Sequence, residues 1–284
     1  MAGSIMRELQ GIHIPSLGSV RSYEQALKNV AVAMALQGKH LRDLSPERAL
    51  SYLEQRAEEV GQKSLDMERQ AIQHMFWHVS LQLPVGETLK VVKSEHPQIL
   101  LSRAYTHDQV QAIADNQKSQ NSLGTHLAYN GGLRATEIFT LLPVSERSAD
   151  RRAATLEEKF IYREGLIYTV IGKGGLTREV LISYNLAQQL EERRLERPIV
   201  VTDRKIYYRQ HYNLQGGRNW SQSFSRASKN VLGWSHGAHG VRHSYAQERM
   251  DELRNNGFPR EKALQVVSQE LGHFRSDIVE IYLR

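Results

Sequence analysis

The sequence predicts an α+β fold that is mainly α-helical and carries one small β-hairpin or sheet. Three observations predict this class. Apolar residues recur at helical spacing through the first third of the chain, as in RSYEQALKNVAVAMALQG (21–38). The pattern changes in LIYTVI (166–171) and LTREVLI (176–182), which are rich in β-branched and aromatic residues. Helical patterns then resume at Tyr184 and continue over most of the remaining chain.

Composition bounds the class of protein. The 284 residues are enough for two domains. No long apolar run predicts a transmembrane helix, and MAGSIMRELQ lacks the apolar core of a secretory signal. Because cysteine is absent, a disulfide scaffold, a thiolate zinc site and a cysteine nucleophile are excluded, and the composition fits a reducing compartment. The net charge of +6 and the pI of about 9.4 favour an anionic partner such as nucleic acid.

The first third predicts three amphipathic helices, which we assign to a helical domain at residues 1–82. The first helix ends near Gly38, where a C-terminal cap belongs. The second begins at Ser45-Pro46, with the serine as N-cap and the proline in the first helical position. The third covers residues 64–81. Residues 83–104 contain two prolines and a glycine without a sustained period, so we interpret them as an interdomain linker.

Residues 105–284 form the second predicted domain. Thr106 and Gln109 make a capping-box pair at the start of its first helix. The segment GKGG between the two strand patterns predicts a β-hairpin whose turn carries Lys173. The other predicted helices cover residues 121–130, 134–142, 184–196, 221–232, 241–255, 260–271 and 276–284, with a loop at residues 255–259.

Two basic residues stand where the backbone can approach an anion closely. Arg134 follows Gly131-Gly132 in YNGGLRATEIFTLL, and Glu137, one helical turn further, can orient its guanidinium. Lys173 lies between glycines at the hairpin tip, a position suited to entering a DNA groove or donating a proton. Taken alone, each residue is more typical of a solvated surface.

The segment SHGAHGVRHSYAQERM (235–250) concentrates basic and titratable side chains. His239 and Arg242 are three residues apart, so a helix places both on one face. The spacing of His236, His239 and His243 also fits a metal site, although the chain has no cysteine and no HExxH pattern. A helix surface with incidental histidines is the third interpretation.

The segment LGHFRSDIVEIYLR (271–284) places His273 in a turn after Gly272 and Tyr282 nine residues further on. A tyrosine at this position is commonly a packing residue. It acts as a nucleophile only in a neighbourhood that binds phosphate and activates its hydroxyl.

These four motifs in this order resemble the tyrosine recombinase (integrase) family, whose signature is Arg, a hairpin Lys, His-x-x-Arg, His or Trp, and Tyr. The resemblance extends over residues 105–284 and implies that they form the catalytic domain, while residues 1–82 resemble the core-binding domain, which binds DNA. It implies a catalytic set with Tyr282 as nucleophile: Arg134, Lys173, His239, Arg242, His273 and Tyr282. His236 and His243 have no place in the pattern.

The resemblance implies a site-specific DNA recombinase of a mobile genetic element, located in the cytoplasm at the nucleoid. Such an enzyme cleaves and rejoins strands through a 3′-phosphotyrosyl intermediate, with arginines taking the role of a metal, so no cofactor and no metal are expected. The implied partners are double-stranded DNA with specific recombination sites, a homo-tetramer on two such sites, and an accessory DNA-bending or directionality protein, with no membrane partner. A type IB topoisomerase and a catalytically silent DNA-binding protein of the same fold are the alternatives.

Two further expectations concern the chain end and the basic residues. Only Leu283 and Arg284 follow Tyr282, so no long tail can dock onto a neighbouring subunit. We therefore expect the segment from Ser276 either to be loosely held or to pack with Tyr282 away from Arg134 and Arg242. Further basic residues fit a DNA clamp formed by the two domains: Arg147, Arg151, Arg152, Lys205, Arg209, Arg218, Arg226 and Lys229.

Overall fold

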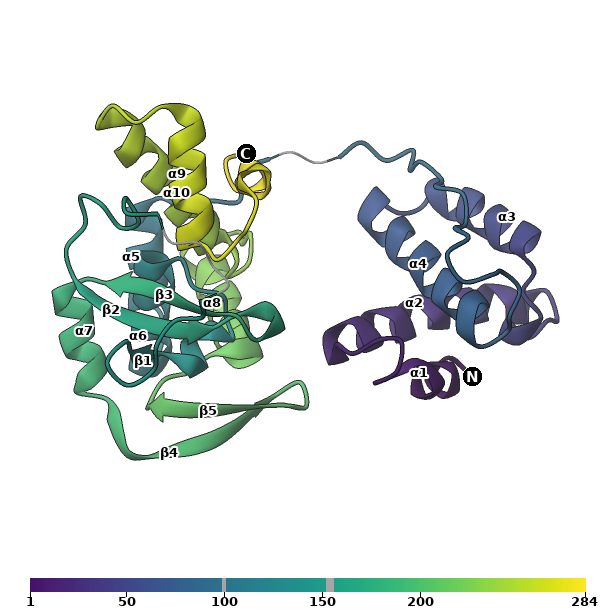
Figure 1. Ribbon diagram of the computed structural model, residues 1–284, viewed down its shortest axis with the longest axis horizontal. Coiled ribbons are helices and arrows are strands. Elements are labelled where there is room, and N and C mark those ends of the chain that lie inside the picture. Colours follow the sequence, from purple (N-terminus) through teal and green to yellow (C-terminus); the bar gives the residue numbers. More distant parts are fainter. Residues whose placement is uncertain (99–100, 152–155) are drawn as a thin grey trace. The chain divides into compact units, whose positions relative to one another are not determined.

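A computed structural model describes residues 1–98, 101–151 and 156–284 (Figure 1). The chain divides into two compact units, Met1–Leu100 and Leu101–Arg284. Residues 99–100 of the expected linker and Arg152 lie outside the described residues. None of the described helices is long and apolar enough to cross a membrane.

The first unit is a helical bundle. Its elements are α1 (Ala2–Leu9), α2 (Leu17–Leu36), the 3-10 helix η1 (Leu41–Asp43), α3 (Pro46–Ala57) and α4 (Gln62–His78). The Ser45 hydroxyl accepts a hydrogen bond from Arg48 N at 3.4 Å, which caps α3 as the Ser-Pro pair predicts. The helix α1 was not predicted, but Ile5 and Leu9 on one of its faces are fully buried in the core of the bundle.

The chain after α4 packs back onto the bundle. Leu89 is buried in the core, and its backbone N–H donates to Gln73 Oε1 at 3.0 Å. Ser94 N–H donates to Gln62 Oε1 at 2.9 Å. Polar side chains of α4 thus bind a segment that has no regular structure of its own. The described residues 83–98 belong to the first unit, whereas the sequence analysis assigned them to a linker.

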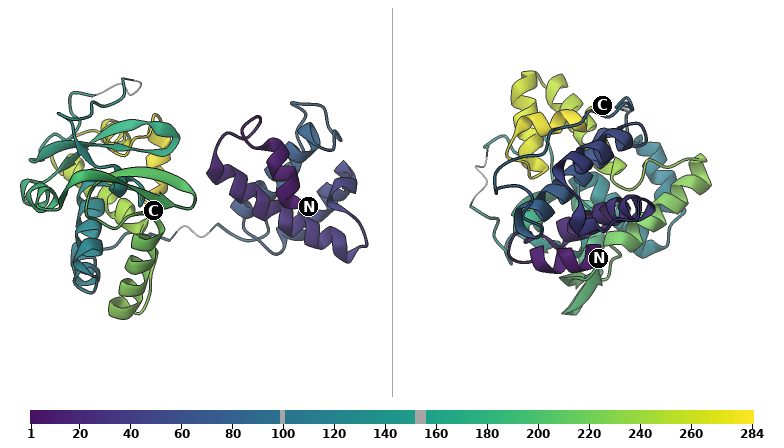
Figure 2. Two further views of the ribbon diagram at one scale, coloured as in Figure 1. Left: turned by 90° about the horizontal axis from the view of Figure 1, so that it is seen from below. Right: turned by 90° about the vertical axis from the view of Figure 1, so that its right-hand side faces the viewer.

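The second unit builds its helices around a small sheet (Figure 2). The helices are α5 (His107–Asp115), α6 (Ser119–Gly131), η2 (Glu137–Thr140), α7 (Tyr184–Glu191), α8 (Gly217–Leu232), α9 (Gly240–Asn255), α10 (Arg260–Glu270) and η4 (Ser276–Ile281). Thr106 and Gln109 form the predicted capping box of α5. The loop between α9 and α10 lies where the sequence predicts it.

The three-stranded antiparallel sheet contains the predicted hairpin. Its strands, in the order β1-β2-β3, are β1 (Leu142–Pro143), β2 (Leu166–Ile171) and β3 (Thr177–Ile182). Tyr168 pairs with Val180, and both side chains are buried in the core. The turn forms the short 3-10 segment η3 (Lys173–Gly175), in which Gly174 and Gly175 have positive φ angles. The mainly helical α+β class is therefore confirmed.

A second sheet was not predicted. It is the antiparallel ribbon of β4 (Arg194–Asp203) and β5 (Ile206–Tyr212), which Figure 1 shows apart from the three-stranded sheet. The predicted helix at 184–196 is wrong at its end, because α7 stops at Glu191 and β4 starts at Arg194. The apolar run of β4 does not alternate with polar residues, and its tip lacks glycine and asparagine.

Candidate active site

Arg134 reaches the site because α6 ends in a left-handed residue. Gly132 caps α6 with a φ of +59°, and a Cβ there would lie 2.8 Å from the Tyr245 ring. The chain then turns into the segment before η2. Arg134 Nη1 donates to Glu137 Oε1 at 2.7 Å, and Arg134 N–H donates to Glu137 Oε2 at 2.9 Å. Glu137 orients Arg134 as predicted. Arg134 lies before the 3-10 helix η2 and Glu137 is its first residue.

Glu137 is a fully buried carboxylate shared by three arginines. Arg178 of β3 donates to its Oε2 at 2.7 Å, and Arg242 Nη1 lies 4.0 Å from the same oxygen. Burial alone would raise the pKa of Glu137, but the charges of Arg178, Arg242 and Arg134 hold it well below its ordinary value. The carboxylate therefore stays ionised and holds the guanidiniums close together.

Arg242 is completely buried near the start of α9. It donates to the carbonyl oxygens of Gly132 and Leu271, which lie at the ends of α6 and α10. Burial, followed by the charge of Arg134, lowers the pKa of Arg242 to about 10. The group is therefore still a cation at neutral pH. Its Nε donates to the hydroxyl of Tyr282 at 3.4 Å.

His273 lies at the meeting point of the site. Its Nε2 is 3.4 Å from Nη2 of Arg134, from Nη2 of Arg242 and from the hydroxyl of Tyr282. Burial, followed by the charges of Arg242 and Arg134, lowers the pKa of His273 to about 3. The imidazole is therefore neutral at pH 7. A neutral imidazole beside a phenol is able to accept its proton.

Tyr282 is 7% exposed and its ring lies within the cluster of His239, His243 and His273. The expectation that Tyr282 packs away from Arg242 is wrong. The short η4 before it buries Val279 completely, and Gln247 Nε2 donates to Tyr282 O at 2.9 Å. Packing against α10 and this hydrogen bond hold a segment too short to be stable alone.

His239 and His243 lie four residues apart, one just before α9 and one in its first turn, and both face Tyr282. Their ring centroids are 5.8 Å and 4.9 Å from that of Tyr282. Burial, together with nearby arginines, lowers the pKa of each histidine to about 4. Sequence reasoning placed His239 in the site but left out His243. Their spacing of four residues was the signal that could have included it.

His236 takes no part in this cluster. Its ring packs against Trp234, with centroids 4.4 Å apart, and against Tyr105 at 5.7 Å. Within residues 1–98, 101–151 and 156–284, no group of three histidine, aspartate or glutamate side chains is arranged to hold a metal ion.

Lys173 is exposed in η3, and no hydrogen bond or ion pair joins its side chain to another described residue. The hairpin nevertheless begins beside the site. A Cβ on Gly172 would lie 3.1 Å from Glu137 Oε1 and 3.8 Å from Arg134 Nη1. Lys173 is the next residue, so the structure brings its backbone near the arginines while its side chain faces solvent.

Sequence reasoning missed Arg178 because it belongs to the alternating pattern of a strand. It is buried, and besides Glu137 it binds the carbonyl oxygen of Glu270 at 2.6 Å. Arg147 was expected in a DNA clamp but is half-buried: it donates to the carbonyl oxygens of Thr140 and Thr169, the latter at 2.7 Å. Arg147 therefore supports the β1–β2 region.

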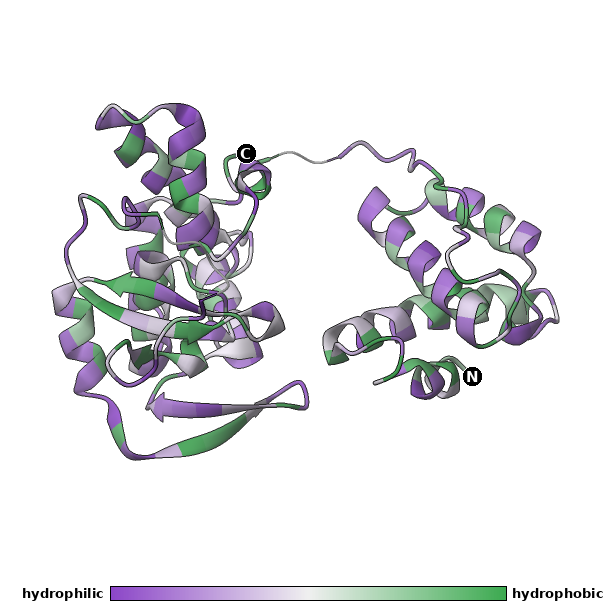
Figure 3. Cartoon of the chain, in the orientation of Figure 1, coloured by the Kyte–Doolittle hydropathy of each residue, from purple (hydrophilic) through white to green (hydrophobic). Residues whose placement is uncertain are grey.

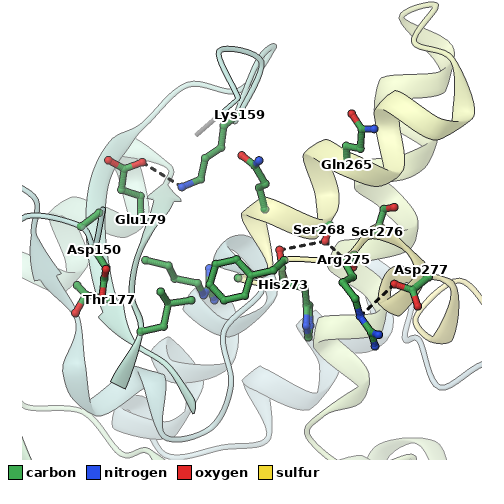
Figure 4. A pocket seen from close by; sticks show the side chains of 16 residues that line it. Asp150, Lys159, Thr177, Glu179, Gln265, Ser268, His273, Arg275, Ser276 and Asp277 are labelled. Carbon is green, nitrogen blue, oxygen red and sulfur yellow. Dashed lines mark hydrogen bonds and ion pairs between the residues drawn. The ribbon is translucent and has the colours of Figure 1, made fainter. Parts of the chain in front are cut away.

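A pocket of about 470 Å³ adjoins the site between β3, the end of α10 and η4 (Figure 4). Arg178 and His273 contribute to its wall. Lys159, further along the wall, donates to Glu179 at 3.1 Å. His273 thus contacts the arginine cluster and also borders this pocket.

No protein-family model and no curated protein sequence matches this chain. Among solved structures it is similar to a lambda integrase dimer bound to a COC′ core site, with a TM-score of 0.62 and 14% identity; the match covers 100% of this chain and 76% of that one.

Two further solved structures show the same similarity. The Tn1549 transposon integrase in complex with transposon right end DNA gives a TM-score of 0.61 at 11% identity, covering 100% of this chain and 94% of that one. The XerH site-specific recombinase bound to difH substrate gives a TM-score of 0.57 at 15% identity, and the match covers 100% of this chain and 81% of that one. Together with the order of its helices and sheet, these similarities show that the chain has the tyrosine recombinase fold.

Proposed function

We propose that this protein is a site-specific DNA recombinase that cleaves and rejoins strands through a 3′-phosphotyrosyl intermediate. One observation carries the proposal: the Tyr282 hydroxyl lies 3.4 Å from both a neutral imidazole nitrogen of His273 and the Nε of Arg242. In this proposal Tyr282 is the nucleophile, His273 is the base and Arg242 is the cation that binds the phosphate. The similar structures add support, since their descriptions name recombinases and integrases on DNA.

In the proposed cleavage step, the Tyr282 oxygen attacks the scissile phosphorus and its proton passes to His273. The Tyr–O–P bond forms while the P–O5′ bond breaks. Lys173 gives a proton to the departing 5′ oxygen, which leaves as a free hydroxyl. A 5′-hydroxyl of a second DNA end then attacks the phosphotyrosine and reverses every transfer. No external energy source is needed, because the covalent link retains the energy of the broken bond.

The two arginines stabilise the charge that develops on phosphorus. Arg134 and Arg242 both carry guanidiniums that can donate hydrogen bonds to the non-bridging oxygens. In this proposal Arg242 exchanges the bonds that it makes to Tyr282 and His273 for bonds to the phosphate. A donor aimed at developing charge contributes about 3 kcal/mol to the barrier reduction. Glu137 keeps the two groups close despite their repulsion. His239, which faces Tyr282, supplies a further hydrogen bond to the phosphate in this proposal.

The proposed partners follow from the reaction. Exchange between two duplexes needs four active sites, so the protein acts as a homo-tetramer on two specific DNA sites. The helical unit at the start of the chain binds the same DNA as a core-binding domain, and an accessory protein bends the DNA or sets the direction. The substrate places the enzyme in the cytoplasm, at the nucleoid, and a mobile genetic element is its source.

A nicked suicide substrate tests the proposal. A DNA site is first selected from a randomised duplex library and located by footprinting, and a nick then lets the cleaved end diffuse away. The wild-type chain should accumulate a covalent adduct, and Tyr282→Phe should form none while binding DNA as tightly. An adduct that persists in the variant would disprove the role of Tyr282. Relaxation of any supercoiled plasmid by a monomer would instead identify a topoisomerase.

A further inference from the structure

The ribbon β4–β5 has one face, the open face, whose side chains are exposed among the residues that the structure describes. Partners across an antiparallel pair point to the same face. Val200 pairs with Arg209, and Thr202 pairs with Tyr207. Val200 is 71% exposed and Tyr207 is 75% exposed. Figure 3 shows the apolar stretch of β4 beside the more polar β5. The open face therefore combines a cation, two hydroxyl groups and an apolar surface.

The tip of the ribbon holds two basic residues in a conformation that disfavours them. Asp203 pairs with Ile206, so Arg204 and Lys205 form a two-residue turn with φ angles of +48° and +62°. Such a turn favours Asn-Gly, because most residues are strained at positive φ, whereas glycine lacks a Cβ and asparagine tolerates this conformation. Basic side chains at this tip are therefore less favourable for the hairpin than Asn-Gly would be.

The ribbon carries more positive than negative charge toward solvent. Arg197, Lys205 and Arg209 are exposed, and none of their side chains makes a hydrogen bond or ion pair with another residue in the described part of the chain. Arg204 contacts Asp203, which is itself buried. Glu196 is the exposed acidic residue of the ribbon.

The other face fixes the ribbon to the loop that carries the candidate site. The Tyr208 ring lies 5.4 Å from that of Phe139, in the same short helix η2 as Glu137. Just after the ribbon, Gly217 N–H donates to the carbonyl oxygen of Ala135 at 2.7 Å. The ribbon is therefore held in a defined position relative to the arginine cluster.

We propose that the open face of this ribbon binds duplex DNA beside the site of cleavage. Lys205 and Arg209 contact phosphates, while Tyr207 and Val200 lie against the groove. A two-stranded ribbon fits the major groove, and hydroxyl and apolar side chains contact sugars and base edges there. The inference rests on the proposed function and adds a contact surface outside the catalytic set.

Charge favours DNA over a second copy of this chain as the occupant. The protein carries a net charge of +6, and the ribbon face is itself basic. Two such surfaces repel each other, whereas a phosphate backbone attracts both. A copy of the chain is therefore retained only as an alternative outcome of the test.

The salt dependence of DNA binding tests the proposal. The full chain and the double variant Lys205→Gln/Arg209→Gln are titrated with a short duplex over a range of salt concentrations. Each lost phosphate contact reduces the slope of log K against log salt by about 0.9, so we expect a reduction of about 2. The matched control is Lys118→Gln/Arg254→Gln, which removes two exposed charges of the same unit outside the ribbon. Its slope should be unchanged.

A second variant separates binding from folding. Arg204→Asn/Lys205→Gly gives the turn residues that its backbone favours, so the melting temperature should rise or stay constant. DNA affinity should nevertheless fall. A loss of affinity in a protein that is at least as stable cannot come from misfolding.

Each of the other outcomes overturns the inference. Equal salt slopes in all variants, or an equal reduction of the slope in the control, would show that the ribbon makes no specific contact with DNA. If the wild type still forms its covalent adduct in that case, the proposed function is unaffected. A change in sedimentation of the free protein with no change in slope would assign the ribbon to contacts between copies. Failure of the wild type to bind any duplex would contradict the inference and the proposed function together.

Discussion

The hydroxyl of Tyr282 and the Nε2 of His273 lie 3.4 Å apart in the second unit of the chain. Two arginine Nη2 atoms approach the same nitrogen at 3.4 Å. Because guanidiniums only donate hydrogen bonds, Nε2 must present its lone pair, so the proton of the neutral ring is on Nδ1. In this tautomer Nε2 carries the lone pair that can accept the proton of the phenol.

The protonation state of His273 is directly measurable. Its pKa is lowered to about 3, against about 6.5 for an ordinary histidine, so the ring should remain neutral as the pH falls from 8 to 5. Heteronuclear NMR of the imidazole nitrogens in the DNA-free protein should show the Nδ1–H form throughout this range. Exposed His40 provides a comparison within the same sample. A midpoint for His273 between 6 and 7 would contradict the burial of the site.

Glu137→Gln should destabilise the second unit strongly. The substitution removes the anion between three guanidiniums and leaves the buried Arg178 and Arg242 without compensation, which costs about 3–5 kcal/mol. Urea denaturation measures the change. The control Glu280→Gln removes an exposed partner of Arg260 and should leave the unfolding free energy nearly unchanged. Equal stability of both variants would show that the arginines do not depend on Glu137.

Gly132→Ala tests whether the end of α6 is packed as tightly as described. A Cβ at this left-handed residue would lie 2.8 Å from the Tyr245 ring and 2.9 Å from a Leu271 methyl group. Gly257→Ala is the control, since its φ is +85° but nothing lies within 4 Å of the added carbon. Both substitutions place a side chain at a positive φ angle, which lowers the free energy of unfolding in each variant. The steric contacts should lower the free energy of unfolding of Gly132→Ala by about 1–3 kcal/mol more. Thermal unfolding that ranks them equally would refute this packing.

Lys173→Gln should slow cleavage by about 10²–10⁴-fold if Lys173 protonates the leaving 5′ oxygen. A substrate with sulfur in place of that oxygen leaves without a proton, and it should restore the rate of the variant toward that of the wild type. Single-turnover adduct formation measures both rates. An equal loss on both substrates would limit Lys173 to binding DNA.

Much of the fold could be predicted because local signals agreed with tertiary packing. The helices α2, α3 and α4 carry clear apolar faces, and the hairpin of β2 and β3 combines strand-forming residues with a glycine-rich turn. The ribbon β4–β5 could not be predicted, because one of its faces stays exposed and its turn residues are unfavourable. Its structure depends on the contact with η2, which no local pattern reveals.

The candidate site shows the same division. Five of the six predicted residues lie close together, and the side chain of the sixth, Lys173, is exposed. The five are Arg134, His239, Arg242, His273 and Tyr282. Arg178 was missed because its contact with Glu137 arises only where β3 packs beside η2. His243 was left out although its spacing of four residues from His239 places both on one helix face. The packing of Tyr282 into the site was also missed. The short helix before it is stabilised by burying Val279 against the rest of the unit, and its local helix-forming tendency alone is too weak.

The most direct test of the account identifies the residue that becomes linked to DNA. The trapped covalent complex is digested with nuclease and trypsin, and mass spectrometry locates the modified peptide. Trypsin releases residues 276–284, SDIVEIYLR, in which Tyr282 is the single tyrosine. The account predicts that this peptide carries a nucleotide joined through its 3′-phosphate to Tyr282. A link to any other residue, or to the 5′ end of the strand, would contradict it.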